Sequence, residues 1–318
     1  MTTSKIQTPY FTLEKLEDGV YAAIANKGEG AMGNSGFIDI GKEIVIFDTF
    51  TTPAAAREFR RLAEEITQKR IKYVFNSHYH GDHTFGNQIF KDVTIISTAK
   101  TRELHRDKNI IIDSNQEMEE MRNYLDHLEE RLEAERIPIL RVSLENQIKE
   151  MKKVHDSIPE LQIVLPNLTF ENRLVLHGET RSVEFYCFGG GHTPSDAFLY
   201  LPKEKIAFMG DIVLENLHPP IYNSQEFIDN LIRISKLDIQ RIVPGHGNLV
   251  TNSQIDVMLN YLHHLTDRVS QALEKRIQWE EILALEAPEE YSTWTGLDGY
   301  KRNLKTVYNE LKGTYTLR

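Results

Sequence analysis

The stretch "NSHYHGDHTFGN", residues 76–87, contains three histidines and one aspartate within six residues. It begins at the end of "IKYVF", an apolar run that predicts a β-strand. Side chains two apart at an extended strand end point the same way, so His78 and His80 can converge on one ion. A glycine then lets the chain turn, and Asp82 and His83 leave the turn in a direction that suits a second ion. Imidazole and carboxylate ligands favour zinc, iron or manganese over calcium.

The crowding of these groups is itself informative. Similar groups that are desolvated together repel one another unless an ion holds them, so packing alone is a poor explanation for the cluster. A histidine that stands alone in this chain is better explained as a surface or packing residue. We therefore expect no metal-binding role for His105, His127, His155, His177, His263 and His264.

Three further candidate ligands stand at the ends of apolar runs. His192 follows a run of glycines in "FGGGHTPSD", Asp211 closes "AFMGD", and His246 lies between two glycines in "IVPGHG". Each signal is weak alone. A site for two metal ions needs such additional ligands, and strand ends that face one rim would supply them.

In this order, each after an apolar strand, these residues resemble the ligand pattern of the metallo-β-lactamase superfamily from about Val20 to Val250. The resemblance implies an α/β fold, the αββα sandwich, with two mixed sheets face to face, helices outside and the metals at one edge. The ligand sets that it implies are His78, His80 and His192 for one ion and Asp82, His83 and His246 for the second.

The same resemblance implies roles at the metal site for two more carboxylates. Asp211 would bridge the two ions, and Asp48, which ends "EIVIFDT", would orient a ligating imidazole from outside the ligand set. Two divalent ions that share a water lower its pKa toward ~7 and polarise a scissile carbonyl or phosphoryl oxygen. We expect a metal-bridging hydroxide as the nucleophile, with Asp82 and Asp211 as catalytic residues. The cofactors would be two divalent ions per chain, with zinc as the first choice and iron or manganese as alternatives.

The residues say less about the substrate. True β-lactamases of this superfamily carry cysteine or serine where this chain has Asp211, so the chain looks more like the glyoxalase II and lactonase branches. The expected protein is a metal-dependent hydrolase that cleaves a small ester, thioester or lactone. Phosphodiester hydrolysis on the same metal centre is the alternative, and a metal-stabilised, non-enzymatic binding protein is a weaker one.

The segment "ENLHPPIYN" follows Asp211 and should form a loop at the metal edge. His218 and Tyr222 in this loop are candidates for contact with a substrate. Both could equally pack around the Pro-Pro turn, and the sequence leaves this choice open.

The chain organisation predicts one domain over residues 1–318. Its N-terminal part alternates strand-like runs with one amphipathic helix, which Thr51 or Thr52 should cap just before Pro53. A helical extension at the C-terminus occupies about residues 253–318 and should begin with one long helix as far as Leu283.

A helical insertion interrupts this domain at about residues 101–159, where glycine is nearly absent. Apolar residues recur there at steps of three and four on both sides of "RIPIL", which predicts two joined helices. Such a hairpin can lie on its own domain, cover the pocket or form a homodimer, because stripes rich in methionine adapt to several partners.

Composition narrows the class of protein. A formal net charge of -10 offers no general attraction for phosphate backbones, so we expect no nucleic-acid partner. No apolar run is long enough to cross a bilayer, and the first residues lack the apolar core of a secretory signal. The single cysteine, Cys187, can form no internal disulfide. These features predict a cytoplasmic protein that acts on a small molecule.

Overall fold

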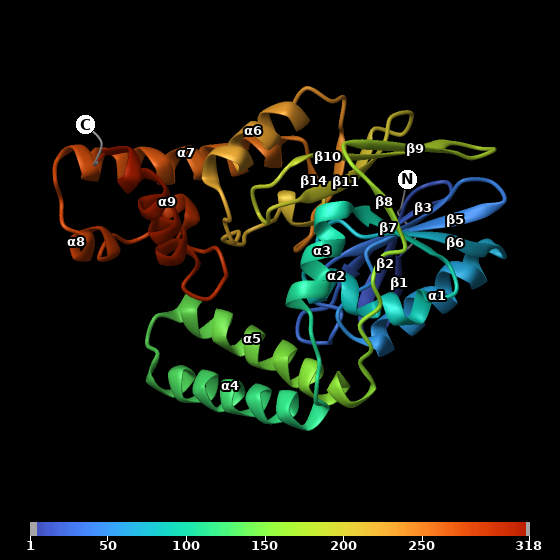
Figure 1. Cartoon of the computed structure of the whole chain (residues 1–318), viewed down its shortest axis with the longest axis horizontal. Helices are drawn as coiled ribbons and strands as arrows, with labels where there is room; N and C mark the ends of the chain where they lie inside the picture. The colour runs from blue at the N-terminus through green and yellow to red at the C-terminus, as the bar shows by residue number, and fades with distance from the viewer. Residues whose placement is uncertain (1–4, 316–318) are drawn as a thin grey trace.

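Two β-sheets packed face to face form the centre of the molecule, and helices cover their outer faces (Figure 1). The computed structural model describes residues 5–315. The first sheet contains, in order, β1 (Lys5–Gln7), β2 (Phe11–Glu17), β3 (Val20–Ala25), β4 (Ser35–Asp39), β5 (Glu43–Phe47), β6 (Arg70–Phe75), β7 (Thr94–Thr98) and β8 (Leu168–Phe170). Strands β1 to β5 pair antiparallel, whereas β5 to β8 pair parallel.

The second sheet has six strands, again of mixed direction. Its order is β14 (Val250–Thr251), β13 (Arg241–Val243), β12 (Ile206–Phe208), β11 (Asp196–Leu201), β10 (Ser182–Gly189) and β9 (Arg173–His177). Strands β12 and β13 pair parallel, and the other neighbours pair antiparallel. The predicted αββα sandwich of two mixed sheets is therefore confirmed.

The alternation of side chains along each strand produces the layers. In β11, Ala197, Leu199 and Leu201 join the apolar cluster between the two sheets. Phe198 and Tyr200, which alternate with them, join the cluster beneath the covering helices. A strand buried on both faces needs apolar residues at nearly every position, and "AFLYL" provides them.

The α-helices of residues 5–315 are α1 (Pro53–Thr67), α2 (Gly81–Thr84), α3 (Ala99–Lys108), α4 (Ser114–Ala134), α5 (Pro138–Ser157), α6 (Ser224–Ile234), α7 (Ser253–Glu274), α8 (Trp279–Leu283) and α9 (Gly299–Tyr315). Within that range, no helix combines the length and the apolar character needed to span a bilayer. Helix α1 begins as predicted, because the Thr52 side chain accepts the N–H of Ala55 and Pro53 occupies the first turn.

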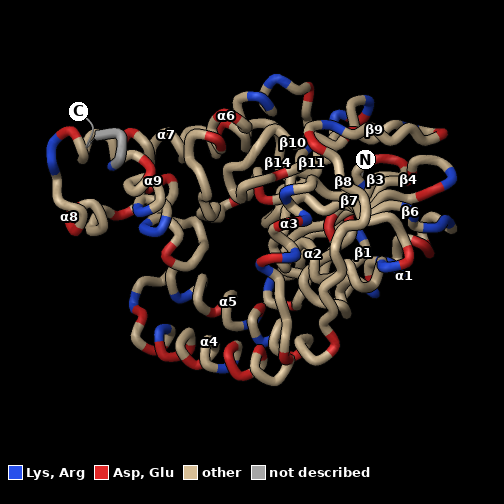
Figure 2. The backbone as a smooth tube through the Cα atoms, viewed as in Figure 1, with Lys and Arg blue, Asp and Glu red and all other residues tan. Residues whose placement is uncertain are grey.

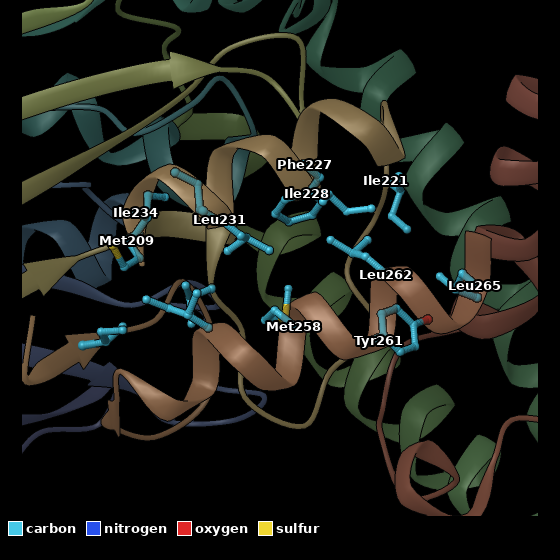
Figure 3. Close-up of a cluster of buried hydrophobic side chains, with 14 of the residues drawn as sticks. Met209, Ile221, Phe227, Ile228, Leu231, Ile234, Met258, Tyr261, Leu262 and Leu265 are labelled. Atoms are coloured by element: carbon cyan, nitrogen blue, oxygen red, sulfur yellow. The ribbon is translucent and has the colours of Figure 1, made fainter. Parts of the chain in front are cut away.

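Helices α6 and α7 pack against the outer face of the second sheet (Figure 3). Phe227 and Leu231 of α6 lie in one buried cluster with Met258 of α7. Met209, which follows β12, is fully buried in the same cluster. This packing supports the backbone that leads directly into Asp211.

The prediction of a single helix from Ser253 to Leu283 is wrong, because α7 ends at Glu274 and α8 begins at Trp279. Arg276 adopts the left-handed conformation with φ 57. Its N–H donates to the carbonyl of Leu273, and the next N–H donates to Ala272, which is the Schellman pattern of a helix end. Glycine is the usual signal for such an ending, and here an arginine takes its place.

Helices α4 and α5 form the predicted hairpin, which lies apart from the two sheets in Figure 1. The hairpin has a small apolar core of its own that includes Leu128, Leu144 and Ile148, and Met32 and Leu297 pack against this core from outside. Because β7 and β8 are parallel neighbours, the segment that carries the hairpin is the crossover connection between them.

Replacing Leu128 by alanine should loosen the hairpin, because Leu128 is fully buried between its two helices. We expect Leu128→Ala to lower the free energy of opening of α4 and α5 by about 2–5 kcal/mol. Native-state hydrogen exchange of the backbone amides of both helices measures this change. Glu130→Ala, at an exposed position of α4, should change it by less than about 0.5 kcal/mol. Unchanged exchange in Leu128→Ala would contradict the role of this core.

Candidate metal centre

The candidate ligands converge because the strands that carry them end at one rim. Strand β5 runs parallel to β6, and β12 runs parallel to β13, so the members of each pair end at the same edge. Two backbone–backbone hydrogen bonds join the sheets at this rim: the N–H of Ala197 donates to the carbonyl of Ser77 at 2.9 Å, and the N–H of Asn34 donates to the carbonyl of Gly245 at 2.7 Å. The rim is therefore a joint between both sheets.

His78, His80, His192 and Asp211 form the first ligand group. The Nε2 atoms of His78 and His192 each lie 3.1 Å from Nδ1 of His80. Asp211 Oδ2 lies 3.2 Å from Nε2 of His192 and 4.0 Å from Nε2 of His78. Tetrahedral zinc with bonds of about 2.0–2.1 Å keeps its ligand atoms about 3.4 Å apart, so the spacing suits one such ion.

Asp82, His83 and His246 form the second ligand group. Oδ2 of Asp82 lies 3.1 Å from Nε2 of His246 and 3.5 Å from Nε2 of His83. The second carboxylate oxygen of Asp211, Oδ1, lies 3.1 Å from Nε2 of His83 and 3.4 Å from Nε2 of His246. Asp211 thus presents one oxygen to each group.

The structure brings all of the proposed ligands into these two adjacent groups. The six histidines that we set aside as isolated belong to neither group within the described part of the chain. Asp211 does not end its strand, as the sequence suggested, but lies in a single turn of 3-10 helix, Gly210–Ile212, just after β12.

Glycines relieve crowding at two positions next to the ligands. A Cβ atom on Gly245 would lie 2.0 Å from Oδ1 of Asp211, so this glycine lets the carboxylate approach the backbone before His246. Gly81 has no left-handed backbone and begins helix α2, so our expectation of a glycine-dependent turn there is wrong. A Cβ on Gly81 would lie 2.5 Å from the ring of Phe85. Glycine is therefore required at this position because a larger residue would collide with that ring.

Asp48 binds the loop that carries the ligands of β6, through Ser77 and His83. Its Oδ1 accepts the N–H of Ser77 at 2.8 Å, and its Oδ2 accepts the Ser77 hydroxyl at 2.7 Å. His83 Nδ1 lies 2.8 Å from the same Oδ2, which leaves His83 Nε2 directed at the second group. The fully buried Asp48 has φ 54, a conformation that aspartate tolerates better than most residues.

Two further ligand imidazoles are also held by their second ring nitrogen. Nδ1 of His192 lies 3.0 Å from the carbonyl of Pro220, and Nδ1 of His246 lies 3.1 Å from the carbonyl of Met32. A hydrogen-bond partner on one ring nitrogen determines that the other nitrogen faces the metal, and it increases the basicity of that other nitrogen. Pro220 and Met32 act through backbone atoms, so no residue type in the sequence marked them.

The electrostatics of the site show what an ion would replace. Burial opposes charge on His246, but Asp211 and Asp82 outweigh it and raise the pKa of His246 to about 10. The same carboxylates raise the pKa of His83 well above its ordinary value despite its burial. Burial opposes charge on Asp82 and Asp211 too, yet the neighbouring imidazolium groups hold the pKa of both carboxyls well below its usual range. Metal ions would displace these protons as the counter-charge.

Within the two ligand groups, two buried atoms remain unsatisfied by the protein itself. Nε2 of His83 and Oδ1 of Asp211 lie 3.1 Å apart, and neither has a hydrogen-bond partner. Buried polar atoms without partners are rare and require an explanation. A metal ion between the members of the second group supplies one, and the donor set of imidazoles and carboxylates fits zinc, iron or manganese.

A cavity of about 690 Å³ opens beside both ligand groups. His218 lines this cavity, as the sequence allowed, and its side chain is only 6% exposed. Tyr222 is 55% exposed and is not part of the lining, because its backbone N–H is bonded to Gly191 and its side chain lies at the surface. Of these two loop residues, only His218 is placed to meet a substrate.

Sequence reasoning missed the lining residues that come from helical segments outside the core. The hairpin contributes Tyr124 and Gln147, so it shapes the pocket, and α9 contributes Lys301, Arg302 and Lys305. The grouping of three cations within five positions of one helix was visible in the sequence. Nothing in the sequence connected that helix with the histidines.

Removal of Asp211 should disturb both ions, because each of its oxygens faces a different group. We expect Asp211→Ala to remain folded by circular dichroism, to fall from near two metals per chain toward one or fewer, and to lose at least about 100-fold in turnover. The metal content and turnover of Asp211→Asn should lie between those of the unmodified protein and Asp211→Ala, since the amide keeps an oxygen but loses the charge. Elemental analysis and activity measurements test this, with exposed Asp126→Ala as the control. Two tightly held metals and near-normal turnover in Asp211→Ala would show that the ligand assignment is wrong.

Asp48→Asn tests the support behind the second group. Asparagine also tolerates the left-handed backbone, but it lacks the charge that binds His83 and Ser77. We expect metal affinity to fall about 10–100-fold, as measured by competition with a chelator. Asp39→Asn, which removes a carboxylate bound to Lys69 and outside both groups, should leave affinity unchanged. Equal affinities for Asp48→Asn and the unmodified protein would contradict this role.

Comparison with known proteins supports this description. A model of the metallo-beta-lactamase superfamily matches residues 28–246. The "Beta-lactamase-like protein 2 homolog" of Caenorhabditis elegans is 25% identical over 124 residues, which cover 38% of this chain and 42% of that protein. The chain thus matches less than half the length of this curated relative.

Two solved structures show the same fold. The inverting sec-alkylsulfatase Pisa1 from Pseudomonas sp. superposes with a TM-score of 0.66 at 18% identity, over 94% of this chain and 50% of that one. The structure of TMB-1 superposes with a TM-score of 0.56 at 16% identity, over 81% of this chain and 99% of that one. At such low identity these likenesses concern the fold alone. From its family match, its two mixed sheets and its grouped histidines and aspartates, we conclude that the chain belongs to the metallo-beta-lactamase superfamily, whose members are metal-dependent hydrolases.

Proposed function

We propose that this protein is a dinuclear metal-dependent hydrolase that cleaves a small ester, thioester or lactone. The observation that carries the proposal is the position of Asp211, whose two oxygens face two separate ligand groups. A scaffold that needed metal only for stability would have no reason to place both groups beside an open cavity.

In this proposal His78, His80 and His192 hold one ion, Asp82, His83 and His246 hold the second, and Asp211 binds both. Two ions held there would supply a water of lowered pKa as the nucleophile and would polarise the scissile carbonyl. Zinc is the first choice, and iron and manganese suit the same donors.

The residues of the chain would position the reactants. Asp82 lies in the cavity wall, so its carboxylate can accept a hydrogen bond from the attacking water and orient it. Asp48 would keep His83 Nε2 directed at the ligand group through its contact with Nδ1. The cavity has the volume of a small-molecule site, which suits a substrate of that class.

The choice among substrates follows from Asp211, which stands where true β-lactamases have cysteine or serine. By resemblance, a carboxylate there favours the thioester- and lactone-cleaving branches. Cytoplasmic location, the absence of a nucleic-acid partner and a homodimer through the hairpin remain predictions from the sequence.

Phosphodiester hydrolysis is the second candidate function. Lys301, Arg302 and Lys305 line the cavity, and such cations could bind a phosphodiester. The same two ions could polarise a phosphoryl oxygen.

A substrate panel separates these candidates. With metals loaded, we expect turnover of a lactone or thioester, slower turnover of bis(p-nitrophenyl) phosphate, and negligible turnover of penicillins and carbapenems. Chromogenic assays at equal enzyme and metal concentrations measure the turnover of each substrate, and Asp211→Ala controls for contaminating activity. Efficient carbapenem hydrolysis would contradict the proposed substrate class, and the phosphodiester as the best substrate would favour the second candidate.

A further inference from the structure

Helix α9 brings a group of positive charges to the cavity beside the ligand groups. Every lysine and arginine of the described cavity lining, namely Lys301, Arg302 and Lys305, comes from this one helix. Figure 2 shows α9 carrying Lys and Arg positions where it approaches the α4–α5 hairpin. The whole chain has a formal net charge of -10, so this local excess of positive charge runs against the overall balance.

Carboxylates of the protein leave these charges largely uncompensated. Asp298, which also lines the cavity, is already bonded to Arg131 through contacts of 2.9 and 3.1 Å. Lys301 is 4.0 Å from Glu286, at the limit of an ion pair. Among the residues that the structure describes, no carboxylate forms an ion pair with Arg302 or Lys305. Cations that line a cavity without partners are suited to bind an anion from solution.

His218 adds a hydrogen-bond donor to the same wall. The hydroxyl of Tyr261 accepts the amide of Asn303 at 3.0 Å and lies 2.9 Å from Nδ1 of His218. Tyr261 is fully buried, and His218 Nδ1 is the acceptor within reach of its hydroxyl proton. The Asn303 amide is oriented by the Pro219 carbonyl, to which it also donates at 2.7 Å. His218 therefore carries its own proton on Nε2.

This histidine is coupled to α9 by close packing. A Cβ atom on Gly299, the first residue of α9, would lie 2.4 Å from Cβ of His218. Burial and the charge of Arg302 lower the pKa of His218 to about 4, so the ring is neutral near pH 7. A neutral ring with a proton on Nε2 can donate one hydrogen bond to a ligand.

Outside the ligand groups, the cations and His218, the wall is largely apolar, and Asp298 and Gln147 are its other polar residues. Leu217, Leu283 and Leu297 line it together with Met32. A ligand that fills the cavity would therefore meet apolar side chains as well as the ligand groups and the cations of α9.

We propose that the substrate carries an anionic group, a carboxylate or a phosphate, that is separate from the scissile bond and is bound by Arg302, Lys305 and Nε2–H of His218. The scissile bond then lies at the two ligand groups, and the apolar wall contacts the part of the molecule between them. This proposal rests on the hydrolase function proposed above and identifies its substrate class as an anionic acyl compound. The three side chains act in binding and specificity.

Paired substrates test the assignment in the metal-loaded enzyme. Two p-nitrophenyl esters of equal chain length, one ending in a carboxylate and the other in a methyl group, are compared in the unmodified protein and in Arg302→Gln. We expect Arg302→Gln to raise KM for the carboxylate ester about 10–100-fold, the scale of a lost hydrogen bond to a charged group, with kcat little changed. KM for the methyl ester should stay within about 3-fold, on the scale of an exposed ion contact.

Lys312→Gln is the matched control, because it removes the same charge from α9 at a position outside the cavity lining. It should leave both esters unaffected. Equal changes for the two esters in Arg302→Gln, or no change for either, would overturn the proposal. If bis(p-nitrophenyl) phosphate is the best substrate and Arg302→Gln lowers its kcat, the cations serve the scissile group and the proposal is also overturned.

A binding experiment separates this proposal from the hydrolase function. Metal-free protein is titrated with glutarate and, separately, with inorganic phosphate by calorimetry, and circular dichroism verifies that each variant is folded. We expect the protein to bind at least one of these anions at least about 10-fold more tightly than Arg302→Gln does. The anion that binds more tightly shows whether the anionic group of the substrate is a carboxylate or a phosphate. Equal affinities in both proteins would overturn the anion site even if esters are cleaved, whereas a retained difference without ester cleavage would count against the hydrolase function alone.

Discussion

The position of the buried Asp211 carboxylate is the constraint on which the site depends. It is 5% exposed, and its two oxygens lie 3.1 Å from His83 and 3.2 Å from His192. A buried carboxylate is costly unless opposite charge and hydrogen bonds compensate it. The missing side chain of Gly245 makes space for one oxygen, and the cluster around Met209 fixes the preceding backbone. Core packing and site chemistry are thus coupled through one residue.

The hairpin is connected to this site through a loop of the first sheet. The Glu150 carboxylate of α5 accepts the N–H groups of Gly28 and Gly30, at 2.6 and 3.3 Å. A few residues further along the same loop, the carbonyl of Met32 accepts Nδ1 of His246. The orientation of a candidate ligand therefore depends on a segment that lies outside the sandwich, which gives the insertion a structural role beyond covering the pocket.

The cavity is assembled from three separate parts of the chain. The strand ends contribute the ligand groups, the hairpin contributes Tyr124 and Gln147, and the C-terminal segment contributes Leu297 and the cations of α9. An ion pair between Arg131 and Asp298 joins the second part to the third. A shared fold can in this way retain its metal chemistry at the rim while additions to the chain set the substrate preference.

The αββα architecture was implied by the resemblance of the ligand pattern to a known family. The sequence by itself determined the metal-binding residue types and their place after apolar runs. These features are local, because strand alternation and the spacing of His78 and His80 depend on neighbours in the chain. Short strands such as β8 and β14 and the helix end at Arg276 were missed, since packing or an unusual residue overrides local preference there.

Only the tertiary structure decided which atoms meet. His80 presents Nδ1 whereas His78 and His192 present Nε2, and this choice depends on where each backbone enters the rim. The approach of α9 to His218 likewise depends on packing between segments about 80 residues apart, for which no local pattern exists. Residue type specifies what a side chain can donate or bind, but the direction in which it does so is set by long-range packing around it.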